Sequence, residues 1–176
     1  MGLDPAFPEP LKKIVTVCEA FEGLPPQAED RPMPDWLRKV APQIRAGMNF
    51  KHVATIFLKA KNSPAGCIAT RRQAWNRPAS TITKSEFGSG LLHPEEHRFL
   101  TQAELKRLST FPDDFQFTDR KRAVERIGNA VMPRFMYHVA KAIREEILEK
   151  AGAGGPRIRL KRGQEGPGRK KPRGAR

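Results

Sequence analysis

The chain has 176 residues, enough for one domain with flanking segments, and its 33 Lys and Arg against 19 Asp and Glu give a formal charge of +14. No apolar run approaches the roughly 18 residues that cross a bilayer, and the opening residues lack the apolar stretch of a signal peptide. Two cysteines make no disulfide framework, so we expect a protein of the reducing cytoplasm.

Two short helices are predicted in the first 50 residues. Thr16 and Glu19 have the spacing of a capping box, so a helix should follow Thr16, and the Gly-Leu-Pro-Pro run at 23–26 should end it. Pro34 is a good first residue for a second helix, and Gly47 is a late breaker.

The next part of the chain predicts a small irregular β-unit with basic loops. Residues 53–58 are apolar and rich in β-branched side chains, and residues 80–83 alternate threonine and isoleucine, so both segments favour strands. A turn-rich segment with five basic residues separates them, and the glycines at 88 and 90 predict another loop.

From Arg98 onward the pattern is helical. Thr101 and Glu104 form a second capping-box pair, and Leu105 and Leu108 supply an apolar stripe. A further turn or two is expected in the basic segment that follows.

A bare Gly128-Asn129 bend then leads into the last helix, which should begin near Pro133. Glycine allows close approach to the backbone, so the bend is interpreted as holding something small. The last helix has an apolar face that is wide for a chain with so few strands to cover, so we expect it to need a partner surface. This face consists of Phe135, Met136, Val139, Ala140, Ile143, Ile147 and Leu148.

Residues 151–176 hold nine basic residues and one acid and are rich in glycine and proline. Such a composition buries too little apolar surface to order itself, so we expect a disordered arm. The arm would bind polyanions weakly, or it would serve only to keep the protein soluble.

Few residues have the pattern of an active site. The phosphate-cradling patterns GxGxxG and GxxxxGK[ST] are both missing from the sequence. His93 and His97 are four apart, but Pro94 argues against a helix between them, so exposed loop histidines are favoured over a metal site. Cys18 and Cys67 have no nearby histidine to activate them, and each is predicted to be a small buried side chain.

A basic loop region offers candidate nucleic-acid contacts beside hydroxyl-bearing threonines. Arginine neutralises phosphates, and arginine and glutamine can also read base edges. The alternative is a solvated surface patch with Trp75 packed inward. The candidate residues are Arg71, Arg72, Gln73 and Arg77, next to Thr81.

Four segments, taken in order, resemble the C-terminal half of DNA (cytosine-5)-methyltransferases. "VTVCEAFEGLPP" is similar to the helix after the catalytic domain, and "AWNRPASTITKS" resembles the end of the target-recognition domain. "HRFLTQAELKRLSTFPDDFQF" resembles the ninth motif of the family, and "IGNAVMPRF" resembles the tenth. The match covers about residues 5–150, and the last two motifs together are highly specific.

The resemblance implies an α+β fold. A small irregular β-rich recognition unit would be followed by helices that pack on a Rossmann-like methyltransferase sheet absent from this chain. Residues 1–30 would be a connector with a short helix, 31–97 the target-recognition region, 98–150 the C-terminal helical segment and 151–176 the basic tail.

The resemblance also implies roles for particular residues. Thr81 and Ile82 match the Thr-Ile pair of the family, with Thr81 gripping a phosphate near the target base, and Arg98 matches an arginine that braces the recognition domain. The Gly-Asn bend would line the S-adenosylmethionine pocket through Asn129, Ala130 and Val131.

The sequence departs from the family in lacking its Phe-x-Gly-x-Gly loop, Pro-Cys nucleophile, Glu-Asn-Val element and Gln-Arg-x-Arg-like motif. We therefore expect one part of a methyltransferase, inactive alone, that recognises double-stranded DNA and completes the cofactor site of a second chain. Two alternatives stay open, a non-catalytic DNA-binding module and an inactive remnant of an interrupted methyltransferase gene.

Overall fold

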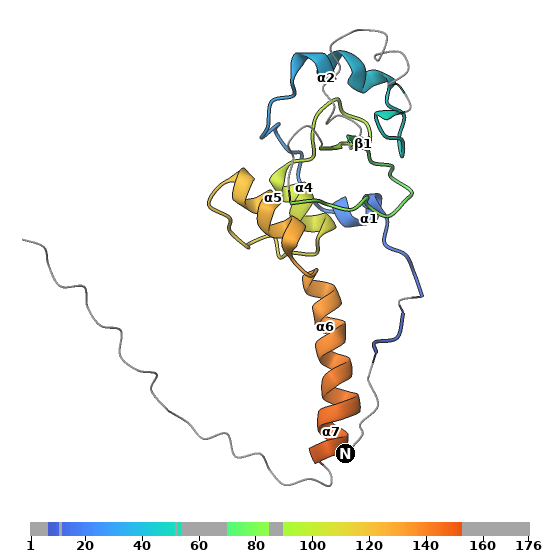
Figure 1. The fold of residues 1–176 in the computed structure, drawn as a ribbon, viewed down its shortest axis with the longest axis vertical. Coiled ribbons are helices and arrows are strands. Elements are labelled where there is room, and N and C mark those ends of the chain that lie inside the picture. The colour runs from blue at the N-terminus through green and yellow to red at the C-terminus, as the bar shows by residue number, and fades with distance from the viewer. Residues whose placement is uncertain (1–6, 11, 52, 54–69, 85–89, 153–176) are drawn as a thin grey trace, which may run out of the picture.

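The computed structural model describes residues 7–152 except residues 11, 52, 54–69 and 85–89. It shows a body from which a helical rod projects (Figure 1). The elements of the body are α1 (Val17–Phe21), α2 (Asp35–Val40), η1 (Ala41–Gln43), β1 (Arg71–Arg72), β2 (Leu91–Leu92), α4 (Gln102–Leu108) and α5 (Arg120–Asn129). The rod, here called the terminal helix, consists of α6 (Pro133–Ala142), η3 (Ile143–Leu148) and α7 (Glu149–Gly152).

The described part of the body combines helices with a small parallel sheet, as expected of a piece of an α+β fold. β1 and β2 pair in parallel, with Arg71 opposite Leu91 and Arg72 opposite Leu92. The prediction of a strand at 80–83 is wrong, because these residues form no strand in the structure. Of the strand predicted at 53–58 only Val53 is described, and it lies in a helical turn.

Two hydrophobic clusters meet at β2. Because neighbouring residues of a strand point to opposite sides, Leu92 enters the first cluster while Leu91 packs on the second. The first cluster consists of Met33, Leu37, Val40, Ala41, Ile44, Phe50, Val53, Leu92 and Phe99, with Trp36 against it. The second consists of Leu100, Leu105, Val124 and Ile127, with Phe21, Ile82, Leu91, Leu108, Phe111 and Phe117 against it.

Both predicted capping boxes are confirmed. The Thr16 hydroxyl accepts a hydrogen bond from the Glu19 amide, while the Glu19 carboxylate accepts one from the Thr16 amide, and α1 ends before Gly23, whose φ is 72°. Thr101 and Glu104 repeat this arrangement at the start of α4. These reciprocal bonds satisfy amide groups that a helix leaves without partners at its first turn.

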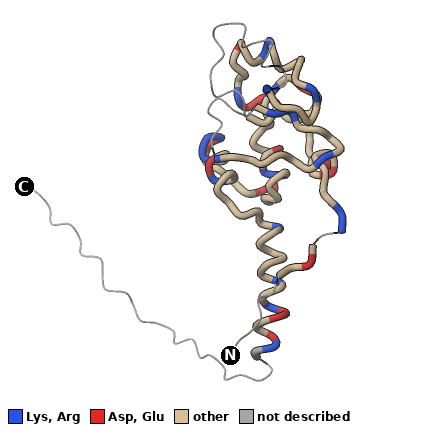
Figure 2. The backbone as a smooth tube through the Cα atoms, turned by 45° about the vertical axis from the view of Figure 1, so that its right-hand side comes forward, with Lys and Arg blue, Asp and Glu red and all other residues tan. Residues whose placement is uncertain are grey.

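The terminal helix begins at Pro133, as predicted, after the longer-than-expected α5. Among the described elements, no other helix or strand packs extensively along it. Its predicted apolar face is consequently open to solvent, with Phe135 57% exposed and Leu148 60% exposed. The half of this rod beside the body is largely uncharged, whereas acidic and basic residues gather toward its far end (Figure 2).

Within the described residues, the helices are too short or too polar to span a membrane. The basic tail predicted at 151–176 lies outside the described residues from position 153 onward.

Candidate functional site

Arg72, a predicted DNA contact, is buried in the body with only 4% of its surface exposed. A guanidinium has five N–H donors, and all five are used inside the protein. They donate over 2.7 to 3.1 Å to the carbonyl oxygens of Ala41, Ile44, His93 and Glu96 and to Nδ1 of His97. Burial lowers the pKa of Arg72. Arg72 therefore ties three separate segments together and has no donor left for a phosphate.

Gln73, the neighbouring candidate, is also buried, at 2% exposure. Its backbone amide donates to the carbonyl of Leu92, and its side-chain Oε1 accepts a 2.8 Å hydrogen bond from the amide of Ser80. Gln73 thus closes the loop between β1 and the Thr-Ile segment. Both side chains are buried within the body, so neither is exposed to DNA in this structure.

The exposed candidates are Arg71, Arg77 and Thr81, while Ile82 packs partly into the second cluster. Trp75, which the alternative of a solvated patch packs inward, is half-buried, and its ring meets Phe21 edge-on at 5.8 Å. The basic loop is therefore two-sided: one set of side chains holds the fold and the other faces solvent. DNA contact by the exposed set stays a prediction.

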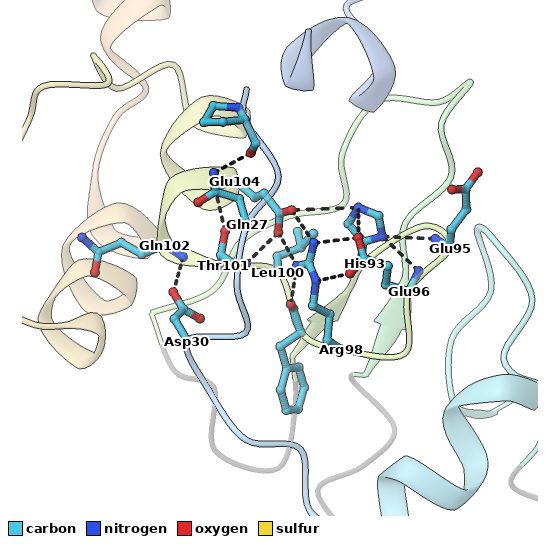
Figure 3. Close-up of polar contacts among 12 residues, drawn as sticks. Gln27, Asp30, His93, Glu95, Glu96, Arg98, Leu100, Thr101, Gln102 and Glu104 are labelled. Carbon is cyan, nitrogen blue, oxygen red and sulfur yellow. Dashed lines mark hydrogen bonds and ion pairs between the residues drawn. The ribbon is translucent and has the colours of Figure 1, made fainter. Parts of the chain in front are cut away.

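Arg98 lies at the centre of a buried ion pair (Figure 3). Its two terminal nitrogens donate to both carboxylate oxygens of Glu104 at 2.8 Å, and its Nε donates to Glu96 at 2.7 Å. The hydrogen bonds that Arg98 donates to Glu104 raise the pKa of Arg98. Burial disfavours the charged form of Glu104, yet the bonds from Arg98 and Thr101 hold its pKa below the usual range. Arg98 thereby fastens the loop after β2 to the first turn of α4.

His93 was expected to be exposed, and this prediction is wrong, since only 6% of it is exposed. The chain folds back after Pro94, so Nδ1 of His93 accepts hydrogen bonds from the amides of Glu95 and Glu96, at 3.3 and 3.0 Å. These bonds require an unprotonated Nδ1. Burial and the nearby Arg98 charge lower the pKa of His93, in the direction that favours the neutral ring. His97 is exposed, as expected.

Cys18 was expected to be buried, but it is exposed. α1 turns Val17 inward instead, and the next residue points about 100° away from it because a helix has 3.6 residues per turn. Cys67 lies outside the described residues. In the part of the chain that the structure describes, no three His, Cys, Asp or Glu side chains are arranged to hold a metal ion.

The predicted cofactor-lining residues lie together where α5 joins the terminal helix. Asn129 and Val131 are exposed and Ala130 is half-buried, with its amide closing the end of α5 on the Ile127 carbonyl. An asparagine side chain offers a donor and an acceptor, and Val131 adds apolar surface. Cofactor lining by these three residues stays a prediction.

Gly128 has a different neighbour from the one expected. A Cβ at this position would lie within 3.0 Å of backbone atoms of Thr83 and Lys84. The space that the missing side chain leaves open is thus filled by the protein's own backbone and not by a small ligand.

A pocket of about 600 Å³, which the sequence did not reveal, opens beside the start of the terminal helix. Its lining includes Val15, Thr16 and Pro78 of the body together with Phe135 and His138 of the terminal helix. The apolar face of the terminal helix therefore begins inside a concave surface of the body.

Comparisons with known proteins agree with the pattern of motifs. The family model described as C-5 cytosine-specific DNA methylase matches residues 29–145. Type II methyltransferase M.NgoFVII of Neisseria gonorrhoeae is 32% identical over 160 residues, which cover 81% of this chain and 41% of that protein. Type II methyltransferase M.Eco47II of Escherichia coli is 27% identical over 157 residues, covering 81% and 38%.

A third relative is Type II methyltransferase M.AquIB of Picosynechococcus sp., 40% identical over 91 residues that cover 45% of this chain and 65% of that protein. This chain thus spans less than two thirds of the length of each of these relatives. No solved structure matches it significantly.

Proposed function

The chain belongs to the C-5 cytosine-specific DNA methylase family, and on that premise we propose that it is the target-recognition and cofactor-completing portion of a DNA (cytosine-5)-methyltransferase. The whole enzyme would transfer a methyl group to C5 of a cytosine in double-stranded DNA. S-adenosylmethionine would supply the methyl group, and the cysteine nucleophile would lie on a second chain. The type II names of the relatives favour a role in restriction-modification.

The observation that carries this proposal is the uncovered apolar face of the terminal helix. Phe135, Met136, Ile143 and Leu148 are each at least 40% exposed along it. A contiguous apolar surface of this kind is typical of an interface. Burying it in a complex is favourable by about 25 cal/mol for each Å² of apolar area removed from water. The face starts beside Asn129 and Val131, so the surface that covers it would also approach the cofactor-lining bend.

Two further observations bear on where the nucleophile lies. Val17, and not the proline of the family's Pro-Cys element, precedes Cys18 on α1. M.AquIB is a shorter protein than M.NgoFVII. The match of 91 residues covers 65% of M.AquIB, whereas the longer match of 160 residues covers only 41% of M.NgoFVII. A short chain is therefore known among the type II methyltransferases.

The DNA-facing surface in this proposal consists of Arg71, Arg77 and Thr81. Their exposure leaves the guanidinium and hydroxyl groups available to phosphates and base edges. Arg72 and Gln73 would contribute indirectly, by holding the loop that presents these groups.

The test is methyl transfer from labelled S-adenosylmethionine to mixed-sequence double-stranded DNA. The chain is assayed alone and together with the protein encoded immediately upstream of it. Activity only in the mixture is expected. Methyl transfer by the pure chain would contradict the division of roles.

A matched pair of variants on the terminal helix sharpens the assay. Ile143→Asp places a charge on the apolar face, whereas Lys141→Asp alters the polar side of the same helix. We expect the Ile143→Asp chain to give an inactive mixture and to fail to co-purify with the upstream protein. The Lys141→Asp chain should preserve both the activity and the co-purification. Equal behaviour of the two variants would show that the apolar face is not the interface, and inactivity of every mixture would favour a DNA-binding module or an inactive remnant.

A further inference from the structure

Gly128 lies against the backbone of the segment that carries the predicted phosphate contact. A Cβ at Gly128 would come within 3.0 Å of the amide nitrogen and Cα of Lys84 and of the carbonyl carbon of Thr83. Side chains essentially never approach so closely, and a backbone neighbour cannot rotate away as a flexible side chain can. Only glycine allows this contact.

The segment of residues 80–84 depends on such contacts for its position, because it belongs to no strand. At its start, the Ser80 amide donates to the buried Gln73 side chain. In its middle, Ile82 packs on the second cluster. At its end, Thr83 and Lys84 rest on Gly128. These three attachments place the exposed Thr81 relative to the rest of the molecule.

Gly128 is equally well placed with respect to the bend. It lies in the last turn of α5, between the fully buried Ile127 and the exposed Asn129. Ile127 anchors this turn in the same cluster that receives Ile82. A shift of the Thr83–Lys84 backbone away from Gly128 therefore changes the distance between Thr81 and Asn129.

We infer that Gly128 is a positioning residue whose contact with Thr83 and Lys84 sets the DNA-facing segment and the cofactor-lining bend as one unit. The inference rests on the proposed function, since it uses Thr81 as a DNA contact and Asn129 as a cofactor contact. Its consequence is that a change at Gly128 weakens the binding of both DNA and S-adenosylmethionine through the backbone of Thr83 and Lys84.

The test compares Gly128→Ala with Gly90→Ala in the chain assayed with its upstream partner. A Cβ at Gly90 would also come within 3.0 Å of its neighbour, but that neighbour is the Phe99 ring in the first cluster, which contains none of residues 80–84 or 128–131. With Gly128→Ala we expect KM for DNA and KM for S-adenosylmethionine to rise together, roughly tenfold to a hundredfold, since small displacements of positioning groups cost this much. Gly90→Ala should lower thermal stability while both KM values of the folded fraction stay unchanged.

A second variant covers the case in which Gly128→Ala does not fold. Ile82→Ala removes the middle attachment of the segment at a half-buried position and leaves the clusters otherwise intact. It should raise both KM values in the same direction but by less. If Gly128→Ala and Gly90→Ala change the KM values equally, or if only one of the two KM values responds to the Gly128 variant, the inference is overturned.

A readout without activity separates this inference from the proposed function. Amide hydrogen exchange of the chain alone should accelerate at residues 80–84 and 128–131 together in Gly128→Ala, and in neither region in Gly90→Ala. Unchanged exchange at either of these regions in Gly128→Ala would overturn the inference. If the wild-type mixture transfers no methyl group, the proposed function fails, and the exchange experiment still decides whether the two segments move as one.

Discussion

The body and the terminal helix of this protein differ in which side chains they bury and which they expose. In the body, even strongly polar side chains are enclosed: Arg72 uses five donors internally, and Arg98 pairs with Glu104 away from water. On the terminal helix, large apolar side chains such as Phe135 and Leu148 face solvent. The body is stabilised by contacts within the chain, whereas the helix has an apolar surface suited to contacts with another molecule.

The largest loss of stability is expected when a buried charge of the body is left without its partner. Arg98→Met removes the arginine and strands the carboxylate of Glu104, which is 2% exposed, so we expect a loss of about 3–5 kcal/mol in the free energy of unfolding. Urea unfolding followed by circular dichroism measures it.

The control for this change is Arg144→Met on the terminal helix. Arg144 pairs with Glu149 in water, where both side chains are more than half exposed, so the expected cost is about 0–1 kcal/mol. Equal losses in the two variants would contradict the distinction between body and helix.

Replacing one leucine by alanine in the body and one on the terminal helix compares the stability that each region gains from its apolar side chains. Leu37→Ala, at 1% exposure in the first cluster, should cost about 2–5 kcal/mol because it leaves a cavity. Leu148→Ala, at 60% exposure, should change the stability of the isolated chain by less than about 0.5 kcal/mol. Thermal unfolding of both variants checks this, and a large loss in Leu148→Ala would mean that the terminal helix is already covered in solution.

A smaller effect is expected at the start of α4. Thr101→Ala deletes the hydroxyl that accepts from the Glu104 amide, and the loss of such a cap costs about 1 kcal/mol. The exposed Thr118, which caps no helix, provides the control Thr118→Ala. The two midpoints of urea unfolding should therefore differ, and coincident midpoints would show that the capping box contributes nothing measurable.

The smallest effect concerns the pH dependence of the body. Because the pKa of His93 is lowered from 6.5 in the folded protein, the unfolded chain takes up the proton first as the pH falls. The contribution of neutral His93 is fully present above pH 6.5 and is lost between that pH and the lower folded pKa. Four charged side chains surround the ring, and the lowering by burial and Arg98 outweighs the raising by the carboxylates of Glu95, Glu96 and Glu104.

Unfolding measured at pH 7 and at about pH 5.5 should show this decrease. His93→Gln should remove it, whereas His138→Gln on the terminal helix should leave it in place. A decrease that persists in His93→Gln would assign it to another group.

Local features of the fold were predictable from sequence. The capping boxes at Thr16 and Thr101 and the start of the terminal helix at Pro133 depend on residues three or four apart, so short patterns are sufficient to find them. The strand at 80–83 was mispredicted because its alternation of threonine and isoleucine reflects one inward residue, Ile82, resting on the second cluster. Within the described residues, no strand pairs with this segment.

The candidate site divides in the same way. The sequence located the basic loop and the Gly-Asn bend, but it did not distinguish Arg71 from Arg72, because adjacent arginines look alike until a strand points one outward and the other inward. It also placed His93 at the surface, although its ring is buried against Phe21 and Trp75, which are distant from it along the chain.

Motifs and local periodicity predicted the family, the starts of α1, α4 and the terminal helix, and the apolar face of the last helix. Which arginine is enclosed, which histidine is buried and what lies against Gly128 follow from the tertiary structure. Those outcomes depend on contacts between segments separated by twenty residues or more, such as Arg72 with Ala41 and Gly128 with Thr83. Their physical cause is burial, which becomes defined only when separate segments close around a group and remove it from water.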